Sequence, residues 1–119
     1  MAKKVDDTVL DAALGVIDNS TRMVVTSAEP ANFAGIAAVA LADVVMAGGD
    51  FAIANGTSGR KVTVAAKSAV TIDSSGTATH VCLDNGSVLL YVTTCTSQAL
   101  VAAGTVDIPA WIIQIDDPV

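Results

Sequence analysis

The sequence has few aromatic and few charged side chains. Phe, Trp and Tyr together make up 3% of its 119 residues, and Asp, Glu, Lys and Arg make up 15%. A core without large rings is built mostly from small Ala and Val side chains, which bury less apolar area per residue. A solitary soluble monomer also usually has a more densely charged surface. With 52% apolar residues, these shortages indicate that other copies of the chain cover part of the surface.

Basic residues are outnumbered two to one. Six Lys and Arg face twelve Asp and Glu, for a formal charge of −6, whereas a protein that wraps nucleic acid needs a basic stripe. The most hydrophobic window, residues 33–46, contains Asp43 and is too short to span a bilayer. Lys3-Lys4 is followed by Asp6-Asp7 where a secretory signal would continue with apolar residues. We therefore expect no nucleic-acid partner, no membrane and synthesis in the cytoplasm.

Cysteine and histidine are too scarce for a disulfide framework or a convincing catalytic group. In the hairpin predicted below, Cys82 lies opposite Leu89 and Cys95 near Gly76, so two buried or half-buried free thiols are expected. His80 and Cys82 share one face of a strand, but residues two apart are about 7 Å apart. That separation is too long for the hydrogen bond that would activate a nucleophile, so the sequence predicts no enzyme.

Metal and cofactor motifs are equally weak. Zinc needs three or four converging ligands, and His80, Cys82 and Cys95 would need a further ligand residue. A metal bound on an oligomer axis is the alternative. The acidic pairs at 6–7 and 116–117 lack the spacing of a calcium loop. The Walker spacing is absent because Arg60-Lys61-Val62 follows Gly59. We expect no cofactor and no metal.

Strand signals are densest in residues 59–97, around which the rest of the chain is organised. Asn85-Gly86 supplies the positive φ values of a tight turn, so residues 77–83 and 88–95 are predicted to form an antiparallel hairpin. In that register His80 faces Tyr91 and Val81 faces Leu90. Both faces of the hairpin are apolar, which requires the domain's second sheet on one side and another sheet or another chain on the other.

Other strands are expected where β-branched runs lie between turn signals, at residues 21–27, 50–54, 60–66, 69–72 and 106–115. Pro109 lacks a ladder donor, so the last strand is expected at an edge or to start there. Residues 97–104 are predicted to be a loop. Residues 33–45 fit either a helix or a strand, with a strand at 38–46 favoured. Many short strands with turns between them predict a mainly β fold, a small antiparallel sandwich or barrel.

Residues 5–18 carry the one convincing helical pattern. Val5, Val9, Leu10, Ala13 and Leu14 fit one helix face, and Asn19-Ser20 ends the pattern. The predicted organisation is a helix or arm at 1–19 and a β-domain at 20–119. The arm packs on the core or docks on a neighbour.

The interface candidates are large apolar residues of the predicted helix or arm, the hairpin and the last strand. Single, scattered aromatics are typical of core and interface anchors rather than of a sugar or nucleic-acid site. Three basic residues could form ion pairs with acidic neighbours of another subunit or be solvated: Arg60, Lys61 and Lys67. The predicted interface residues are Val9, Leu10, Leu14, Leu89, Tyr91 and Trp111.

From about residue 24 to 118 the chain resembles a group of small uncharacterised proteins encoded among the virion-structure genes of tailed bacteriophages and prophages. The segments that carry the resemblance are LADV at 41–44, GRKVTVAA at 59–66, DSSGTATHV at 73–81, LYVTTCTS at 90–97 and IPAW at 108–111. These motifs are structural rather than catalytic. The resemblance therefore transfers no functional residues to this chain.

The resemblance implies a virion protein made in the host cytoplasm. In size and character the chain is similar to capsid decoration, or cement, proteins, which are small, β-rich, homo-oligomeric and bind the outside of the head. The expected partners are further copies of the chain, with a trimer favoured, and the major capsid protein or other virion proteins. Alternatives are a tail, head–tail joining or fibre-base component, or a module that binds a host glycan through the turns at 55–59 and 84–87.

Overall fold

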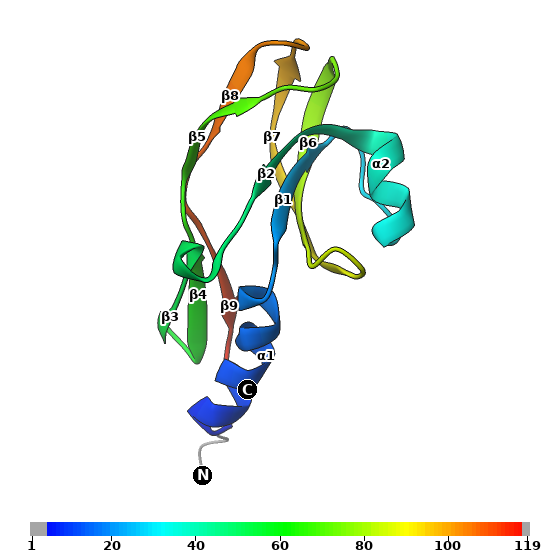
Figure 1. The fold of residues 1–119 in the computed structure, drawn as a ribbon. Helices are drawn as coiled ribbons and strands as arrows, with labels where there is room; N and C mark the ends of the chain where they lie inside the picture. The colour runs from blue at the N-terminus through cyan, green and yellow to red at the C-terminus, as the bar shows by residue number, and fades with distance from the viewer. Residues whose placement is uncertain (1–4, 118–119) are drawn as a thin grey trace.

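The structure is a computed structural model and describes residues 5–117 (Figure 1). Two layers of antiparallel strands face each other. The first has the order β2-β1-β6-β7, with β1 (Arg22–Thr26), β2 (Ala40–Val45), β6 (Gly76–Asp84) and β7 (Leu89–Leu100). The second combines the sheets β3-β4-β9 and β5-β8, with β3 (Phe51–Asn55), β4 (Arg60–Val64), β5 (Lys67–Thr71), β8 (Thr105–Ile108) and β9 (Trp111–Ile115). The predicted mainly β antiparallel fold with one N-terminal helix is confirmed.

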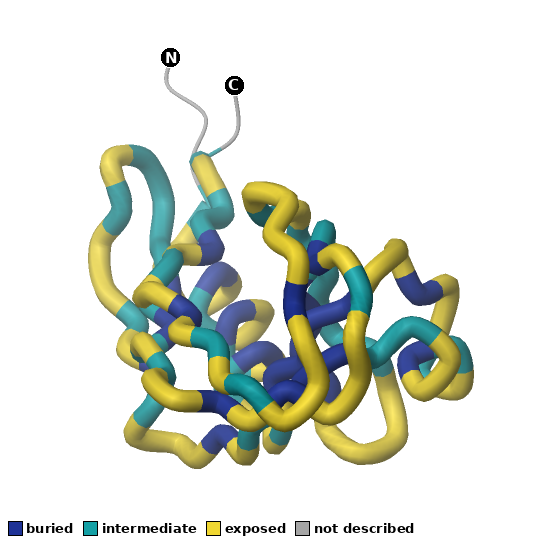
Figure 2. Tube along the Cα trace, turned by 90° about the horizontal axis from the view of Figure 1, so that it is seen from above, coloured by how far each residue is buried: buried dark blue, intermediate teal, exposed yellow. Residues whose placement is uncertain are grey.

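The core lies between the two layers, as the buried positions in Figure 2 show. Met23 and Leu83 from the first layer and Val62 and Val64 from the second are fully buried in one apolar cluster. Val62 and Val64 alternate with the half-buried Lys61 and Thr63, because successive strand side chains point to opposite faces. The strand expected at 60–66 thus has its predicted inner and outer faces.

One side of the two-layer structure is closed and the other is open. On the closed side, Ala42 of β2 bridges to Ile72. The carbonyl of Leu41 there accepts hydrogen bonds from the N–H groups of Asp73 and Ser74, at 2.8 and 3.1 Å. On the other side, β7 and the β8–β9 segment belong to different sheets, and no backbone hydrogen bond joins them within residues 5–117. The two layers therefore form a sandwich that is open along β7.

Helix α1 (Asp7–Asp18) packs against β3 and β4 at one end of the sandwich (Figure 1). The Asp6 carboxylate caps it by accepting from the Thr8 N–H at 2.9 Å. Its buried residues are Leu10, Leu14 and Ile17, so the expected face with Val9 and Ala13 is wrong. The first four residues of the predicted arm, with Lys3-Lys4, lie outside the described residues.

Residues 33–39 are helical, and the favoured strand at 38–46 is confirmed over Ala40–Val45, which form β2. A 3₁₀ helix, η1 (Phe33–Gly35), is capped by the Asn32 side chain and leads into α2 (Ile36–Val39) before β2 begins. Ile36 is buried with Val24 and Cys82 on the outer face of the first sheet. The second apolar face of the hairpin is therefore partly covered by the chain itself, through residues that the sequence left ambiguous.

The hairpin of β6 and β7 exists, but its predicted register is wrong. His80 pairs with Thr94 and Val81 with Thr93, not with Tyr91 and Leu90. The Asn85 side chain accepts from the N–H groups of Ser87 and Val88, so the loop is longer than a two-residue turn and β7 starts at Leu89. A bulge between Leu83 and Asp84 shifts the pairing by a further residue.

Two further boundaries differ from prediction. Strand β7 continues to Leu100, so residues 97–100 are strand rather than loop. Residues 106–115 do not form one strand. Pro109 and Ala110 separate β8 from β9, and the two strands pair in different sheets. A proline that cannot donate to a ladder is a natural place for that change of sheet.

The molecule is elongated. Its principal extents are 54 × 26 × 24 Å and its radius of gyration is 15.2 Å, whereas a compact domain of this length has about 13.5 Å. Within the described part of the chain, no helix is long and apolar enough to cross a membrane. An elongated body exposes more surface than a sphere of the same volume would.

Candidate functional site

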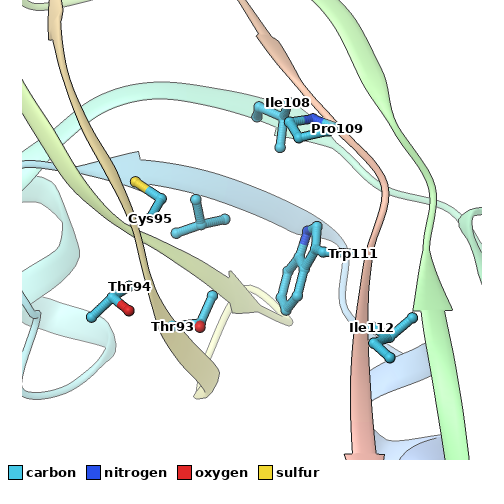
Figure 3. A pocket seen from close by; sticks show the side chains of 8 residues that line it. Thr93, Thr94, Cys95, Ile108, Pro109, Trp111 and Ile112 are labelled. Atoms are coloured by element: carbon cyan, nitrogen blue, oxygen red, sulfur yellow. The ribbon is translucent and has the colours of Figure 1, made fainter.

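The open side contains an apolar cleft between β7 and the β8–β9 segment (Figure 3). One part of it has a volume of about 240 Å³. A second part of about 210 Å³ continues along β7, and the two share Val81, Cys95, Ile108 and Pro109 as lining residues. The shape is a groove along a strand rather than a chamber for a ligand.

Two aromatic rings span the open side where β7 lies beside β9. The ring centroids of Tyr91 on β7 and Trp111 on β9 lie 5.8 Å apart, within the range of favourable aromatic pairs. The indole Nε1 of Trp111 is buried and has no hydrogen-bond acceptor among residues 5–117. A buried donor without an acceptor costs roughly 1–3 kcal/mol.

The described residues that line the two parts of the cleft include one charged residue. Asp107 borders the second part of the cleft, but its carboxylate accepts a 2.8 Å hydrogen bond from the Ala69 N–H. That bond supports the irregular pairing of β5 with β8, where Ala69 has a positive φ of 54°. The groove offers apolar side chains and threonine hydroxyls, which suit a protein surface rather than a charged substrate.

Both cysteines are free, as the sequence predicted. Cys95 is half-buried and lines the cleft, whereas Cys82 is fully buried on the opposite face of the first sheet. Burial raises the pKa of the Cys82 thiol to about 11 and also raises the pKa of Cys95, because desolvation disfavours the thiolate. Neither thiol is an activated nucleophile.

Alkylation with iodoacetamide at pH 8 is expected to modify Cys95 slowly and to leave Cys82 unmodified until the protein unfolds. The thiolate is the reactive species, so labelling of Cys95 should speed up as the pH rises. Mass spectrometry of the native protein and of a urea-unfolded sample measures both sites. In the control Cys95→Ser, native labelling should disappear, and labelling of native Cys82 as fast as Cys95 would contradict this assignment.

His80 takes part in no constellation of catalytic groups in the described chain. Its Nδ1 lies 2.8 Å from the Thr79 hydroxyl, and its backbone pairs with Thr26 and Thr94. No cluster of three or more His, Cys, Asp or Glu that could hold a metal occurs within residues 5–117. The histidine is part of a strand rather than the centre of a site.

The expected basic patch is occupied within the chain. The guanidinium of Arg60 donates to the Asp11 carboxylate at 2.7 and 3.2 Å, which fastens α1 to β4. Lys67 forms a 3.0 Å ion pair with Asp50. Arg60 and Lys67 therefore form ion pairs within the chain, an arrangement that was neither of the two alternatives left open by the sequence, an ion pair with another subunit or a solvated charge.

The predicted interface residues lie in three different places. Leu10 and Leu14 are buried under α1 in the chain's own domain, and Val9 on the same helix is 60% exposed. Leu89 packs beside Ile36 on the outer face of the first sheet. Tyr91 and Trp111 lie together at the cleft. Of the six, only Tyr91 and Trp111 therefore lie at the cleft.

Sequence reasoning missed most of the cleft lining, including Thr93, Thr94, Ile108 and Ile112. One signal was available, because no charged residue lies between Asp84 and Asp107. Natural edge strands usually carry charges or proline that block unwanted pairing. A long uncharged run with high strand propensity therefore indicates an edge strand that packs against another protein surface.

Compared with protein-family models, with curated proteins and with solved structures, the chain matches none of them.

Proposed function

We propose that this chain is a non-enzymatic structural protein of a tailed-bacteriophage virion, acting as a capsid decoration protein. It is made in the host cytoplasm and resides on the particle. The observation that carries the proposal is the uncharged β7 edge beside an apolar cleft, a surface suited to protein contact. The segments that resemble virion proteins, at 59–66, 73–81 and 90–97, form much of β4, β6 and β7.

The proposed mechanism is cementing. A 54 Å long body is long enough to bridge a joint between neighbouring capsid subunits. Each contact buries modest area, but many copies acting together stabilise a particle by multivalency. The head would then resist the outward pressure of packaged DNA better with the protein bound than without it.

The rival hypotheses differ in partner. A tail, head–tail joining or fibre-base component would use the same kind of protein-contact surface on another part of the particle. A glycan-binding module would use the turns at residues 55–59 and 84–87, but neither turn contains an aromatic residue, and sugar sites typically combine aromatic with polar groups. We therefore favour a protein partner over a glycan.

The test is binding of the purified chain to expanded phage heads that lack it. Co-sedimentation is expected with expanded heads, and decorated heads should survive heating or chelator treatment that opens undecorated ones. Unexpanded heads and isolated tails serve as controls. Failure to bind heads overturns the decoration assignment, binding to tails alone favours the runner-up, and retention of the free protein on host cells favours the glycan module.

A further inference from the structure

The loop between β6 and β7 contains a sequence step that can react with itself (Figure 1). Asn85 is followed by Gly86, and both residues are exposed. The backbone nitrogen of the residue after an asparagine can attack the side-chain carbonyl carbon Cγ of that asparagine. Glycine obstructs the attack least, because it has no side chain and the widest choice of backbone conformations. The step therefore has a chemistry beyond its role as a turn.

The first group that such a reaction needs is a base for the attacking nitrogen. The Gly86 N–H donates a 2.9 Å hydrogen bond to Oδ1 of the Asp84 carboxylate, a distance at which a general base can take a proton. The other oxygen, Oδ2, accepts from Nε of Arg22 at 2.9 Å, and Asp84 is 1% exposed. The carboxylate is thus fixed with one oxygen against the nitrogen that must lose its proton.

The second requirement is stabilisation of the oxygen that gains negative charge. Oδ1 of Asn85 accepts hydrogen bonds from the N–H groups of Ser87 at 3.0 Å and Val88 at 2.8 Å. Two backbone donors at these distances polarise a carbonyl and form an oxyanion hole for the intermediate. Among residues 5–117, no acceptor binds the side-chain nitrogen Nδ2 of Asn85, so the fold does not hold the leaving group in place.

We propose that Asn85 is a self-modification site, at which the folded loop converts the asparagine to aspartate and isoaspartate. The nitrogen of Gly86 forms a bond to Cγ of Asn85, the carbonyl electron pair moves to Oδ1, and Asp84 takes the proton. When the carbonyl forms again, the Cγ–Nδ2 bond breaks and Nδ2 leaves as ammonia with the proton from Asp84. Water then opens the cyclic imide at either of its carbonyl groups, and no other reactant is needed.

A second Asn-Gly step in the chain lacks these groups and is the internal comparison. Asn55 is the last residue of β3, and the Gly56 N–H donates at 3.2 Å to the backbone carbonyl of Gly59, which is a far weaker base than a carboxylate. Oδ1 of Asn55 accepts from a side chain, Nη1 of Arg60, at 2.7 Å. We expect the fold to suppress the reaction at Asn55 and to promote it at Asn85.

The modification occurs once in each chain and acts on no external substrate, so it is independent of the proposed virion function. It replaces a neutral side chain in the hairpin loop by a carboxylate. An aspartate at position 85 keeps an oxygen that can accept from Ser87 and Val88. An isoaspartate inserts a methylene group into the backbone and disrupts both hydrogen bonds. The two products therefore differ in their effect on the loop.

The test follows both asparagines while the purified chain is incubated in a mildly alkaline buffer, folded or unfolded in urea. Peptide mapping by mass spectrometry measures aspartate and isoaspartate at positions 55 and 85. In the folded protein, Asn85 should convert at least about tenfold faster than Asn55 and than Asn85 in urea, because a positioned general base contributes about 10²–10⁴-fold. Conversion of Asn85 that is no faster in the folded protein than in urea overturns the proposal.

Asp84→Asn tests the base. The new side chain keeps an oxygen for the Gly86 N–H but cannot take its proton, so conversion of Asn85 should slow by at least about tenfold. The matched control is Asp107→Asn, which neutralises a carboxylate that accepts from the backbone N–H of Ala69 at 2.8 Å and should leave the rate unchanged.

A folded Asp84→Asn variant that converts Asn85 as fast as the wild type overturns the proposal, and so does an Asp107→Asn variant that slows equally. Circular dichroism verifies that each variant is folded. If Asp84→Asn does not fold, the comparison of folded with urea-unfolded wild type decides by itself.

Discussion

Leu14→Ala is expected to lower the free energy of unfolding by about 2–5 kcal/mol. Leu14 is fully buried in the main core and belongs to α1. Truncation removes apolar contact and leaves a cavity between the helix and strands β3 and β4. Total stability of such a domain is about 5–15 kcal/mol, so the loss is a large fraction of it. Urea denaturation of the purified chain measures the change.

Val9→Ala is the matched control for this prediction. Val9 lies on the same helix but is 60% exposed, so its truncation should change the unfolding free energy by less than about 0.5 kcal/mol. The comparison also separates the two roles that the sequence left open for residues 1–19. A docked helix makes Leu14→Ala destabilise the isolated chain, whereas an arm that reaches a neighbour would leave the isolated chain's stability unchanged.

Gly59→Ala should destabilise the protein by roughly 3 kcal/mol, through two separate causes. Gly59 has a φ of +66°, where an L side chain costs about 1–2 kcal/mol. A Cβ there would also overlap the carbonyl oxygen of Ile115 and press on Asp116. Overpacking of this kind costs about 1–3 kcal/mol more. Because Ile115 is paired with Arg60, the overlap pushes β9 away from β4. Thermal unfolding should show a melting temperature lower by roughly 10 °C.

Gly86→Ala isolates the first cause, the positive φ. Gly86 also has a positive φ, +89°, but no atom lies within 4 Å of the position of its added Cβ. This variant should lose only the conformational part, about 1–2 kcal/mol. Equal destabilisation by the two substitutions would show that the overlap with Ile115 adds nothing to the loss of stability in Gly59→Ala.

The sequence predicted elements whose signals are local. The strand with Val62 and Val64 alternates cleanly, and α1 has an acidic cap followed by a helical apolar pattern, so both were placed within a residue or two. The register of the β6–β7 hairpin depends on contacts that local sequence signals do not reveal. Asn85 and Asp84 use their side chains to bind the backbone of the loop, and the Asp84 carboxylate is held at 2.9 Å by Arg22 from β1. A distant strand thus helps to define a turn that Asn-Gly alone would have made shorter.

The cleft was harder to predict than the fold. Whether a strand is an edge depends on which strands of other sheets lie beside it, and nothing in the residues of β7 states that β8 pairs with β5 instead. Tyr91 and Trp111 were recognised as anchors because large rings are rare in this chain. Their contact across the open side required the three-dimensional arrangement. The composition predicted that other copies cover part of the surface, and the missing charges between Asp84 and Asp107 are a signal that this prediction did not use.

The division of the last strand at Pro109 has a consequence for how large an assembly can grow. Of the two edges that border the cleft, the β8–β9 edge is broken at Pro109, a residue without an N–H. The β7 edge is bulged, because the 12 residues of β7 pair along the 9 residues of β6. The β2 edge is occupied by the backbone at Asp73 and Ser74, and β3 is a short strand of five residues. None of these edges offers a long, regular row of donors and acceptors to another strand. Bulges, proline and short strands are the devices that protect exposed edges, so growth of this chain into a fibre by strand addition is disfavoured.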